Sequence, residues 1–398
     1  MSAQFPQYIP SPQENRHLFV NPAQRFLSLS AHKANSFARE SVRAVERYTR
    51  AMPHRKEAYW AEVVERVKCA VSALFSIPLA ALMLIPATTL YCLSACMGSG
   101  RFELVEEGNG KEKPRGKFID VMSLNACLQH PWSPLTGGVE VHTKPIADCA
   151  SRVEALARVI AGKNPDVFLG QEFEDLGAQT EMIQSLKEKG FHYFLRDLGS
   201  NDPIRNNSGL FVASKIPLRE IDFVPYPSED RAGLAKGSNQ GALTFTVRVN
   251  EADLRLVNVH LNYGEGENNQ AARNRQLKNH VIPLINNPHR NAAAFGDLNF
   301  DTSSVCRIES GFLETIGNAL EGRTTCSDEG KHILRGKSRK PGGAACTDCD
   351  EKIDGLLFHK ATGFKITSLQ VKPVRRGNQL LTDHFAVTAS IAPKRQFI

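Results

Sequence analysis

The chain has 398 residues, of which 41% are hydrophobic and 23% are charged, so it can bury a large core, and disorder of the whole chain is excluded. Its 49 Lys and Arg residues against 42 Asp and Glu residues give a net charge of +7, which favours anionic surfaces but excludes a histone-like basic tail. Nine cysteines without the spacing of a disulfide framework predict mostly reduced thiols.

The amino-terminal part of the chain has two polar regions of different character. Residues 1–35 are rich in Pro, Gln, Ser and Asn, which predicts a disordered leader. Residues 36–68 alternate apolar and charged positions at helical spacing, which predicts an amphipathic basic helical region. A helix on an anionic membrane surface and an ordinary surface helix fit this pattern equally well.

A hydrophobic segment follows at residues 69–97, where no side chain is charged. Because about 20 apolar residues cross a ~30 Å hydrocarbon core, this run predicts membrane association through residues 69–97. Pro78 and Pro86 leave a kinked span and a re-entrant hairpin as alternatives. Three cysteines near the ends of the segment are candidate palmitoylation sites, or else small apolar filler: Cys69, Cys92 and Cys96.

The carboxyl-terminal part reads as a single domain. Residues 98–116 are charged and glycine-bearing, which predicts a linker. Short apolar runs predict strands at 118–125, 166–172, 208–214, 242–249, 254–261, 292–300, 352–359 and 384–391. Helical periodicity predicts helices at 147–162, 178–190 and 269–285. Many short strands with fewer helices predict an α/β domain at residues 117–398, in which two packed sheets are flanked by helices.

Polar residues of catalytic type lie at the ends of several predicted strands. They are Asn125, Glu172, Asn258, His260, Asp297, Asn299, Asp354, Asp383 and His384. Because strand ends present side chains to a shared cleft, we expect these residues to form one site. Carboxylate and amide oxygens suit a hard cation such as Mg²⁺, and two histidines supply a general base and a donor to a phosphoryl group.

Seven motifs occur in a fixed order: SLN, LGQE, NSGLFVASKIPL, NVHL, GDLNFD, KIDGLLF and LTDHFAV. Each alone is weak, but the ordered series resembles the endonuclease/exonuclease/phosphatase superfamily over residues 117–393. The resemblance implies a DNase I-like four-layered α/β sandwich with two packed mixed β-sheets. It also implies that Glu172 is the principal metal ligand, that Asn125 lies nearby, and that Asp383 completes the metal site. The implied cofactor is Mg²⁺, with Mn²⁺ as a substitute.

The same resemblance implies catalytic roles for five residues. His384 would be the general base that activates water, and Asp354 would orient it. Asp297 would position the attacking water, and Asn299 would position the phosphate. His260 would donate to the phosphoryl oxygens as charge develops there. These roles imply in-line attack of water on phosphorus without a covalent enzyme intermediate.

Several motifs are more specific. NSGLFVASKIPL, GDLNFDTSS, Tyr226-Pro227, the Gly241-Ala242-Leu243 strand and Thr382 before the Asp-His pair resemble the membrane-anchored, palmitoylated animal branch of the neutral sphingomyelinases. That branch also carries an amino-terminal hydrophobic region with flanking cysteines. The resemblance implies hydrolysis of sphingomyelin to ceramide and phosphocholine at a membrane. Three residues are assigned to substrate binding: Asn207, Asn299 and Lys236.

The chain departs from that branch in three ways. It has only a short stretch where the branch has a long insertion, and it has one hydrophobic segment where the branch has two. Gln240 stands where the branch places a lysine thought to take part in activation, and Lys236 lies four residues earlier. Activation by anionic lipid is therefore in doubt, although an anionic membrane surface remains an expected partner.

Other interpretations remain open. An inositol-polyphosphate 5-phosphatase would need several cations near the cleft, for which Arg205, Lys215, Arg231, Lys236 and Arg273 are candidates, although most read as solvated surface. A membrane-tethered nuclease would show a basic stripe, and none is evident, so we expect no nucleic acid. A non-catalytic scaffold would not need the metal and histidine set. A choline group could contact Phe173, Tyr193 or Phe194, for which core packing is favoured.

A polar segment before Asp354 carries a further constellation. Cys326, His332, Cys346 and Cys349 lie within it, and the C-x-x-C pair is compatible with structural zinc. The spacing of the first two residues is not a standard one for zinc. We therefore favour loop thiols or a disulfide.

Overall fold

The computed structural model describes residues 102–106, 117–129, 149–199, 206–286, 291–300, 316–320, 325, 352–377 and 379–394, with scattered positions between 60 and 89. Among these residues, no helix has both the length and the hydropathy required to cross a bilayer. The predicted leader, most of the predicted helical region and membrane segment, the three candidate palmitoylation sites and the candidate zinc ligands lie outside the described residues.

One sheet has seven strands in the spatial order β1-β4-β5-β3-β2-β13-β12. These strands are β1 (Glu103–Glu106), β2 (Ile119–Leu128), β3 (Val167–Phe173), β4 (Tyr193–Arg196), β5 (Phe211–Ser214), β12 (Phe364–Arg376) and β13 (Gln379–Pro393). β2 and β3 are parallel and are connected through α4 (Cys149–Lys163), as a parallel pair requires a crossover. The other strand pairs of this sheet are antiparallel.

The second sheet has six strands in the order β10-β11-β9-β8-β7-β6. These strands are β6 (Arg219–Pro225), β7 (Gly241–Val249), β8 (Ala252–His260), β9 (Ala292–Asp297), β10 (Ile316–Asn318) and β11 (Asp354–His359). β8 and β9 form its parallel pair. The crossover between them consists of α6 (Glu267–Gln276), the π-helical turn η4 (Leu277–Val281) and α7 (Ile282–Ile285). Two 3₁₀ turns, η2 (Ser228–Asp230) and η3 (Gly233–Gly237), lie between β6 and β7.

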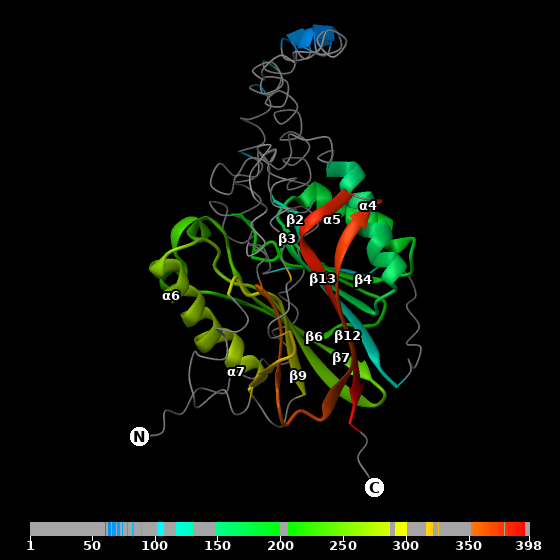
Figure 1. The fold of residues 1–398 in the computed structure, drawn as a ribbon, viewed down its shortest axis with the longest axis vertical. Coiled ribbons are helices and arrows are strands. Elements are labelled where there is room, and N and C mark those ends of the chain that lie inside the picture. Colours follow the sequence, from blue (N-terminus) through cyan, green and yellow to red (C-terminus); the bar gives the residue numbers. More distant parts are fainter. Residues whose placement is uncertain are drawn as a thin grey trace, which may run out of the picture.

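The two sheets pack face to face, and helices cover both outer faces (Figure 1). α4 and α5 (Leu176–Lys187) cover the seven-stranded sheet, while α6 and α7 lie along the six-stranded one. Successive side chains of each strand point to opposite faces of the sheet. Val121 and Leu169 therefore pack between the sheets, whereas Met122 and Phe168 pack under α4 and α5. The four-layered α/β sandwich with mixed sheets is therefore confirmed.

The predicted linker at 98–116 is wrong in part. Residues Glu103–Glu106 form β1, which pairs with β4 at the edge of the seven-stranded sheet. The charges that suggested a linker are used structurally, since Glu103 accepts from Arg196 at 2.7 Å in a buried ion pair. The folded domain therefore includes residues before 117, since Phe102 is 1% exposed in the inter-sheet core.

Strands without a continuous apolar run were not predicted. β12 alternates exposed and half-buried residues along the sheet edge, and β6 is mostly exposed or half-buried on the edge of the other sheet. The predicted helix at 269–285 is present, but it begins at Glu267 and passes through the π-helical turn η4. Edge strands bury one face weakly, so hydropathy alone detects them poorly.

Candidate active site

The register of three neighbouring strands brings three polar residues together. His260 ends β8 and pairs in register with Asp297, which ends the parallel strand β9. Asp354 begins β11, which runs antiparallel to β9, and it also pairs with Asp297. Because the carboxyl ends of parallel strands meet at one edge, β2 and β3 bring Asn125 and Glu172 to the same end of the sandwich.

A buried carboxylate and imidazole form the first functional unit. His384 Nδ1 lies 3.0 Å from Asp354 Oδ2, and the two residues are 5% and 3% exposed. Thr325 holds both strands, since its hydroxyl accepts from the Asp354 backbone N–H at 2.9 Å and its carbonyl accepts from the Phe385 N–H at 2.7 Å. Burial raises the pKa of Asp354, and the His384 imidazole opposes this by lowering it.

Asp297 lies at the centre of the site. Its Oδ2 atom is 3.6 Å from His384 Nε2 and 3.7 Å from His260 Nε2. The same oxygen accepts from Asn125 Nδ2 at 3.0 Å, and Oδ1 accepts from the Asn299 N–H at 2.8 Å. Hydrogen bonds to both carboxylate oxygens fix the orientation of Asp297 between the two imidazoles.

Three residues offer ligand atoms to a cation. One atom each from Glu172, His260 and Asp297 lie within 4.8 Å of one another. His260 Nε2 is buried and has no hydrogen-bond partner among the residues that the structure describes, so a ligand would satisfy it. Gln129 donates to Glu172 Oε2 at 2.8 Å and orients that carboxylate. Two carboxylates and an unpaired imidazole nitrogen fit a divalent cation.

Of the predicted ligands Glu172, Asn125 and Asp383, Glu172 belongs to this group, and the metal roles of the other two stay predictions. Asn125 is fully buried, and both ends of its amide are engaged, with Asp297 and with the Cys127 N–H. In the structure its amide orients Asp297. Asp383 is half-buried, and its charge acts together with that of Glu172 on the Cys127 thiol, whose pKa is raised mainly by burial and further by these carboxylates. Asp383 therefore lies beside the site without entering the three-residue group.

Unusual backbone conformations occur where the site is built. Glu172 and Asn299 have positive φ angles of 57° and 51°, which L-residues adopt at a cost. Gly296, with φ 145°, precedes Asp297, and a Cβ there would collide with the Val259 carbonyl. Gly209 has φ 70° and packs against the Glu172 backbone. Both glycines are required for the close approach that places the two acidic residues.

The three residues assigned to substrate binding lie in different environments. Asn299 is half-buried, and its Nδ2 donates to Leu261 O at 3.1 Å. In the described part of the chain its amide oxygen accepts no hydrogen bond. Asn207 is buried and bridges backbone groups, donating to Glu174 O and accepting from the Gly209 N–H. Lys236 is exposed on η3, and none of the contacts found in the described part of the chain joins it to the site.

The sequence matches no protein-family model and no curated protein. Solved structures do match. Beta toxin 275-280 from Staphylococcus aureus has a TM-score of 0.51 at 17% identity, over 68% of this chain and 99% of the toxin. This chain has the DNase I-like fold. The ordered motifs predicted this fold.

Two other solved structures are more distant in shape. Sphingomyelinase C from Streptomyces griseocarneus has a TM-score of 0.45 at 16% identity, over 69% of this chain and 99% of that protein. A humanized TDP2 from D. rerio has a TM-score of 0.49 at 14% identity, over 69% of this chain and 99% of that protein. The expectation of no nucleic-acid partner stays a prediction.

Sequence reasoning missed Tyr263, which lies beside the site in this DNase I-like fold. Its ring centroid is 6.4 Å from that of His260, and the two rings are inclined by 31°. Burial raises the pKa of the Tyr263 phenol, and the carboxylates of Glu174 and Glu172 raise it further. The available signal was its position in the loop that directly follows the NVHL strand. Phe173 and Phe194, considered for choline binding, lie in the core, as favoured.

A polar network between the sheets was also missed. Gln171 Nε2 donates to Asn258 Oδ1 at 2.7 Å, and Asn258 Nδ2 donates to Gly170 O and Phe211 O at 3.0 and 3.2 Å. Both side chains are fully buried. Because Gln171 belongs to one sheet and Asn258 to the other, their bond fixes the relative position of the two sheets directly beneath Glu172 and His260.

Proposed function

We propose that this protein is a metal-dependent phosphodiesterase that hydrolyses sphingomyelin to ceramide and phosphocholine at a membrane surface. The observation that carries the reaction type is the arrangement around Asp297. His384, paired with the buried Asp354, and His260 both point their Nε2 atoms at Asp297. Glu172 lies beside them and forms the candidate cation site together with His260 and Asp297. A base, an oriented carboxylate and a cation site within a few ångströms suit water attack on phosphorus.

His384 is the general base. Its Nδ1 faces Asp354, so the N–H of the neutral imidazole lies there and Nε2 keeps its lone pair. That lone pair accepts the proton of a water molecule as the water attacks. Asp354 then stabilises the imidazolium that forms, and its burial strengthens this interaction.

Asp297 and His260 act on the attacking water and on the phosphoryl group. Asp297 has both oxygens oriented by Asn125 and Asn299, so it can hold a water next to His384 Nε2. His260 Nε2, which has no hydrogen-bond partner within the described part of the chain, would help to hold the cation when it is a neutral ligand or would donate to a phosphoryl oxygen when protonated. Mg²⁺ held by Glu172 and its neighbours would neutralise charge on the phosphoryl oxygens. Asn299 lies at the same edge and can orient the phosphate.

The sphingomyelin assignment is supported by the motifs shared with the neutral sphingomyelinases. It is also supported by the amino-terminal region, where described positions between 60 and 82 are helical and expose large apolar side chains. Trp60 is 61% exposed and Leu74 is 73% exposed, and apolar surface of this kind is typical of a contact with lipid or protein. Membrane association through residues 69–97 is part of the proposal.

A polyphosphate substrate is less well supported. Among the cations considered for it, Arg231 donates to Ser238 O at 2.7 Å and Arg273 donates to Gly264 O at 2.6 Å, and both are buried. Lys215 donates to Asn164 at the base of the seven-stranded sheet. These three side chains therefore hold loops together, and a phosphodiester with a single negative charge is the better match.

The decisive experiment is phosphocholine release by the purified full-length protein. Mixed sphingomyelin and phosphatidylcholine liposomes would be incubated with Mg²⁺, with Mn²⁺ or with EDTA. A phosphoinositide and plasmid DNA would be assayed in parallel. We expect cation-dependent release from sphingomyelin, absent in EDTA. If phosphate is released from the phosphoinositide, or the plasmid is nicked, while no phosphocholine is released, sphingomyelin is not the substrate. The proposed reaction type, metal-dependent hydrolysis of a phosphate ester, would then still stand.

A further inference from the structure

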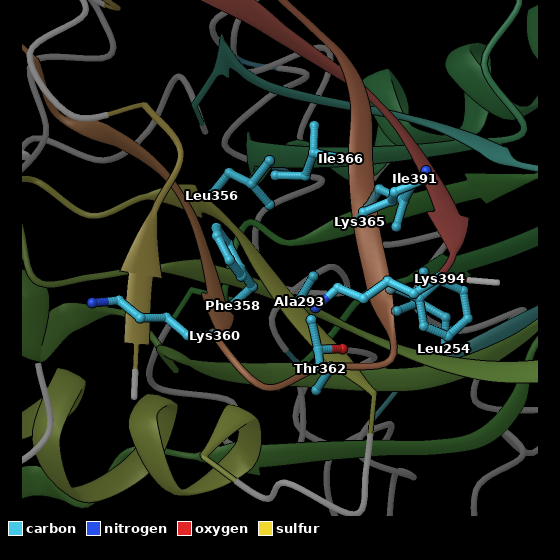
Figure 2. A pocket seen from close by; sticks show the side chains of 12 residues that line it. Leu254, Ala293, Leu356, Phe358, Lys360, Thr362, Lys365, Ile366, Ile391 and Lys394 are labelled. Carbon is cyan, nitrogen blue, oxygen red and sulfur yellow. The ribbon is translucent and has the colours of Figure 1, made fainter. Parts of the chain in front are cut away.

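A cavity opens between the two sheets at the end of the sandwich remote from the site (Figure 2). It has a volume of about 280 Å³. On β9 it is lined by Ala292 and Ala293, whereas Asp297 occupies the other end of the same strand. On β11 it is lined by Leu356 and Phe358, whereas Asp354 begins that strand. The cavity is therefore separate from the catalytic residues.

The interior of this cavity is apolar. Leu254 and Ala293 come from the six-stranded sheet, and Phe364 and Ile391 come from the seven-stranded sheet. A preformed cavity with such walls favours an aliphatic group, because each buried methylene gains hydrophobic free energy. The volume is at the lower end for ligand sites, which suits one chain better than a two-chain lipid or a large planar cofactor.

The rim of the cavity is cationic. Lys360, Lys365 and Lys394 lie around the apolar side chains, and all three are exposed (Figure 2). Among the described residues that line the cavity there is no Asp or Glu. Asp253, which is adjacent to Leu254 in the chain, is already paired with Arg248 at 3.0 Å. An apolar interior below three lysines is complementary to an amphiphile with a negatively charged head.

Hydrogen bonds hold the rim in place. Asn291 Oδ1 accepts from the Gly363 N–H at 2.8 Å, and Asn291 O accepts from the Arg255 N–H at 2.8 Å. Gly363 O in turn accepts from the Lys394 N–H at 2.6 Å. These bonds connect the segments that carry Leu254, Ala292, Thr362 and Lys394. A preformed rim lowers the entropy cost of binding a ligand there.

We propose that this cavity binds a monomeric single-chain anionic amphiphile of the fatty-acid class. The chain lies between the sheets among the apolar side chains, and the positive charge of the lysine rim attracts the carboxylate. This site is independent of the proposed catalytic function, since it shares no side chain with the catalytic residues.

Photolabelling tests the site directly. Full-length protein in phosphatidylcholine nanodiscs would be irradiated with a fatty acid that carries a diazirine on its chain, and labelled peptides would be mapped by mass spectrometry. We expect label on the segments around residues 254, 292–293 and 356–366, reduced by excess laurate. Dodecyltrimethylammonium has the same chain length and the opposite charge, so we expect it to compete poorly.

Two sets of variants separate the parts of the proposal. The exposed pair Lys365→Glu and Lys394→Glu should weaken laurate competition by about tenfold, while the exposed control Lys189→Glu should not. Ala293→Leu, which fills the cavity, should abolish the label. Equal competition by both amphiphiles would overturn the anionic specificity. Competition by phosphatidylserine in the nanodisc, without competition by laurate, would show that the ligand is a bilayer lipid and not a monomeric fatty acid. Label spread over the whole surface would show that the cavity is not a specific binding site.

Discussion

The two ends of the β-sandwich are built from the same strands and differ in chemistry. At one end β8, β9 and β11 present His260, Asp297 and Asp354. At the other end the same strands present Leu254, Ala293 and Phe358 around an apolar cavity. Strand type and sheet register are therefore common to both ends. What differs is the residue at that end of each strand, which is the last residue of β8 and β9 and the first of β11, and the loop that supports it.

The polar end is maintained by features that the apolar end does not need. Its buried groups are held by hydrogen bonds, such as those from Asn125 and Thr325, because an unpaired buried carboxylate is costly. Its backbone adopts positive φ at Glu172 and Asn299. Conformational strain of this kind persists where surrounding structure over-determines it. The comparison suggests that catalytic geometry and fold stability can be perturbed separately.

The sharpest test of that separation uses two equally buried histidines. His384 at the polar end and His359 at the far end of β11 are each 5% exposed. His384→Ala should lower kcat by about 10³–10⁴-fold because the general base is lost. It should also lower Tm, because the buried Asp354 carboxyl loses its partner. His359→Ala should retain activity and lower Tm, since His359 Nδ1 accepts from the Ala361 N–H in the turn after β11. Equal losses of activity in both variants would contradict the assignment.

The role of Glu172 in the candidate cation site can be tested by a substitution that keeps the shape of its side chain. Glu172→Gln keeps the shape of the side chain and its contact with Gln129 but removes a negative charge. We expect the activity at limiting Mg²⁺ to fall about 10²-fold and to recover partly at higher Mg²⁺, because cation affinity is reduced. Cation titration of activity measures this. Glu154→Gln, on the exposed face of α4, is the control, and a similar shift there would contradict the role of Glu172.

The network between the sheets should affect stability more than chemistry. Asn258→Ala removes the acceptor of Gln171 and the donor to Gly170 O and Phe211 O, and leaves buried groups unpaired. We expect a loss of about 2 kcal/mol in the free energy of unfolding, measured by denaturant titration. The exposed variant Asn268→Ala on α6 should change it little. An unchanged stability in Asn258→Ala would show that the sheets do not depend on this network.

Sequence patterns predicted the central strands and most of the polar end, for identifiable physical reasons. Buried strands such as β3 and β9 are continuous apolar runs, and a catalytic residue ends each run. β1 was taken for a linker because it is rich in charged residues. Its Glu103 pairs with Arg196 on the neighbouring strand β4, and the sequence does not show that these two strands are neighbours. Contacts between distant segments, such as Asn125 with Asp297, are likewise invisible to local patterns.

The ligand grouping was harder to predict than the residues themselves. Every residue of the group Glu172, His260 and Asp297 was singled out, and the metal roles of Asn125 and Asp383 stay predictions. The hydrogen bond from Asn125 to Asp297 was not foreseen. Tyr263 was overlooked because a single loop aromatic carries no periodic signal. The lysine-rimmed cavity was overlooked because its lining comes from five strands that are dispersed along the chain.

The smallest expected effect concerns the pH dependence of stability at the polar end. Burial raises the pKa of Asp354 in the folded protein above the ordinary value of 3.8. The folded state therefore holds this proton more tightly than the unfolded state does. The resulting stabilisation is fully present below the ordinary value and is lost as pH rises through the folded-state pKa.

Asp354→Asn has no such proton, so its Tm should rise relative to that of the unmodified protein as the pH increases from about 4 to about 7. Calorimetry in EDTA measures this difference without a bound cation. In a His384→Ala background the difference should grow, because the His384 imidazole is the main influence that lowers the Asp354 pKa. A difference that shrinks with rising pH would mean that the attraction of His384 outweighs burial, and that the Asp354–His384 pair stabilises the fold at neutral pH.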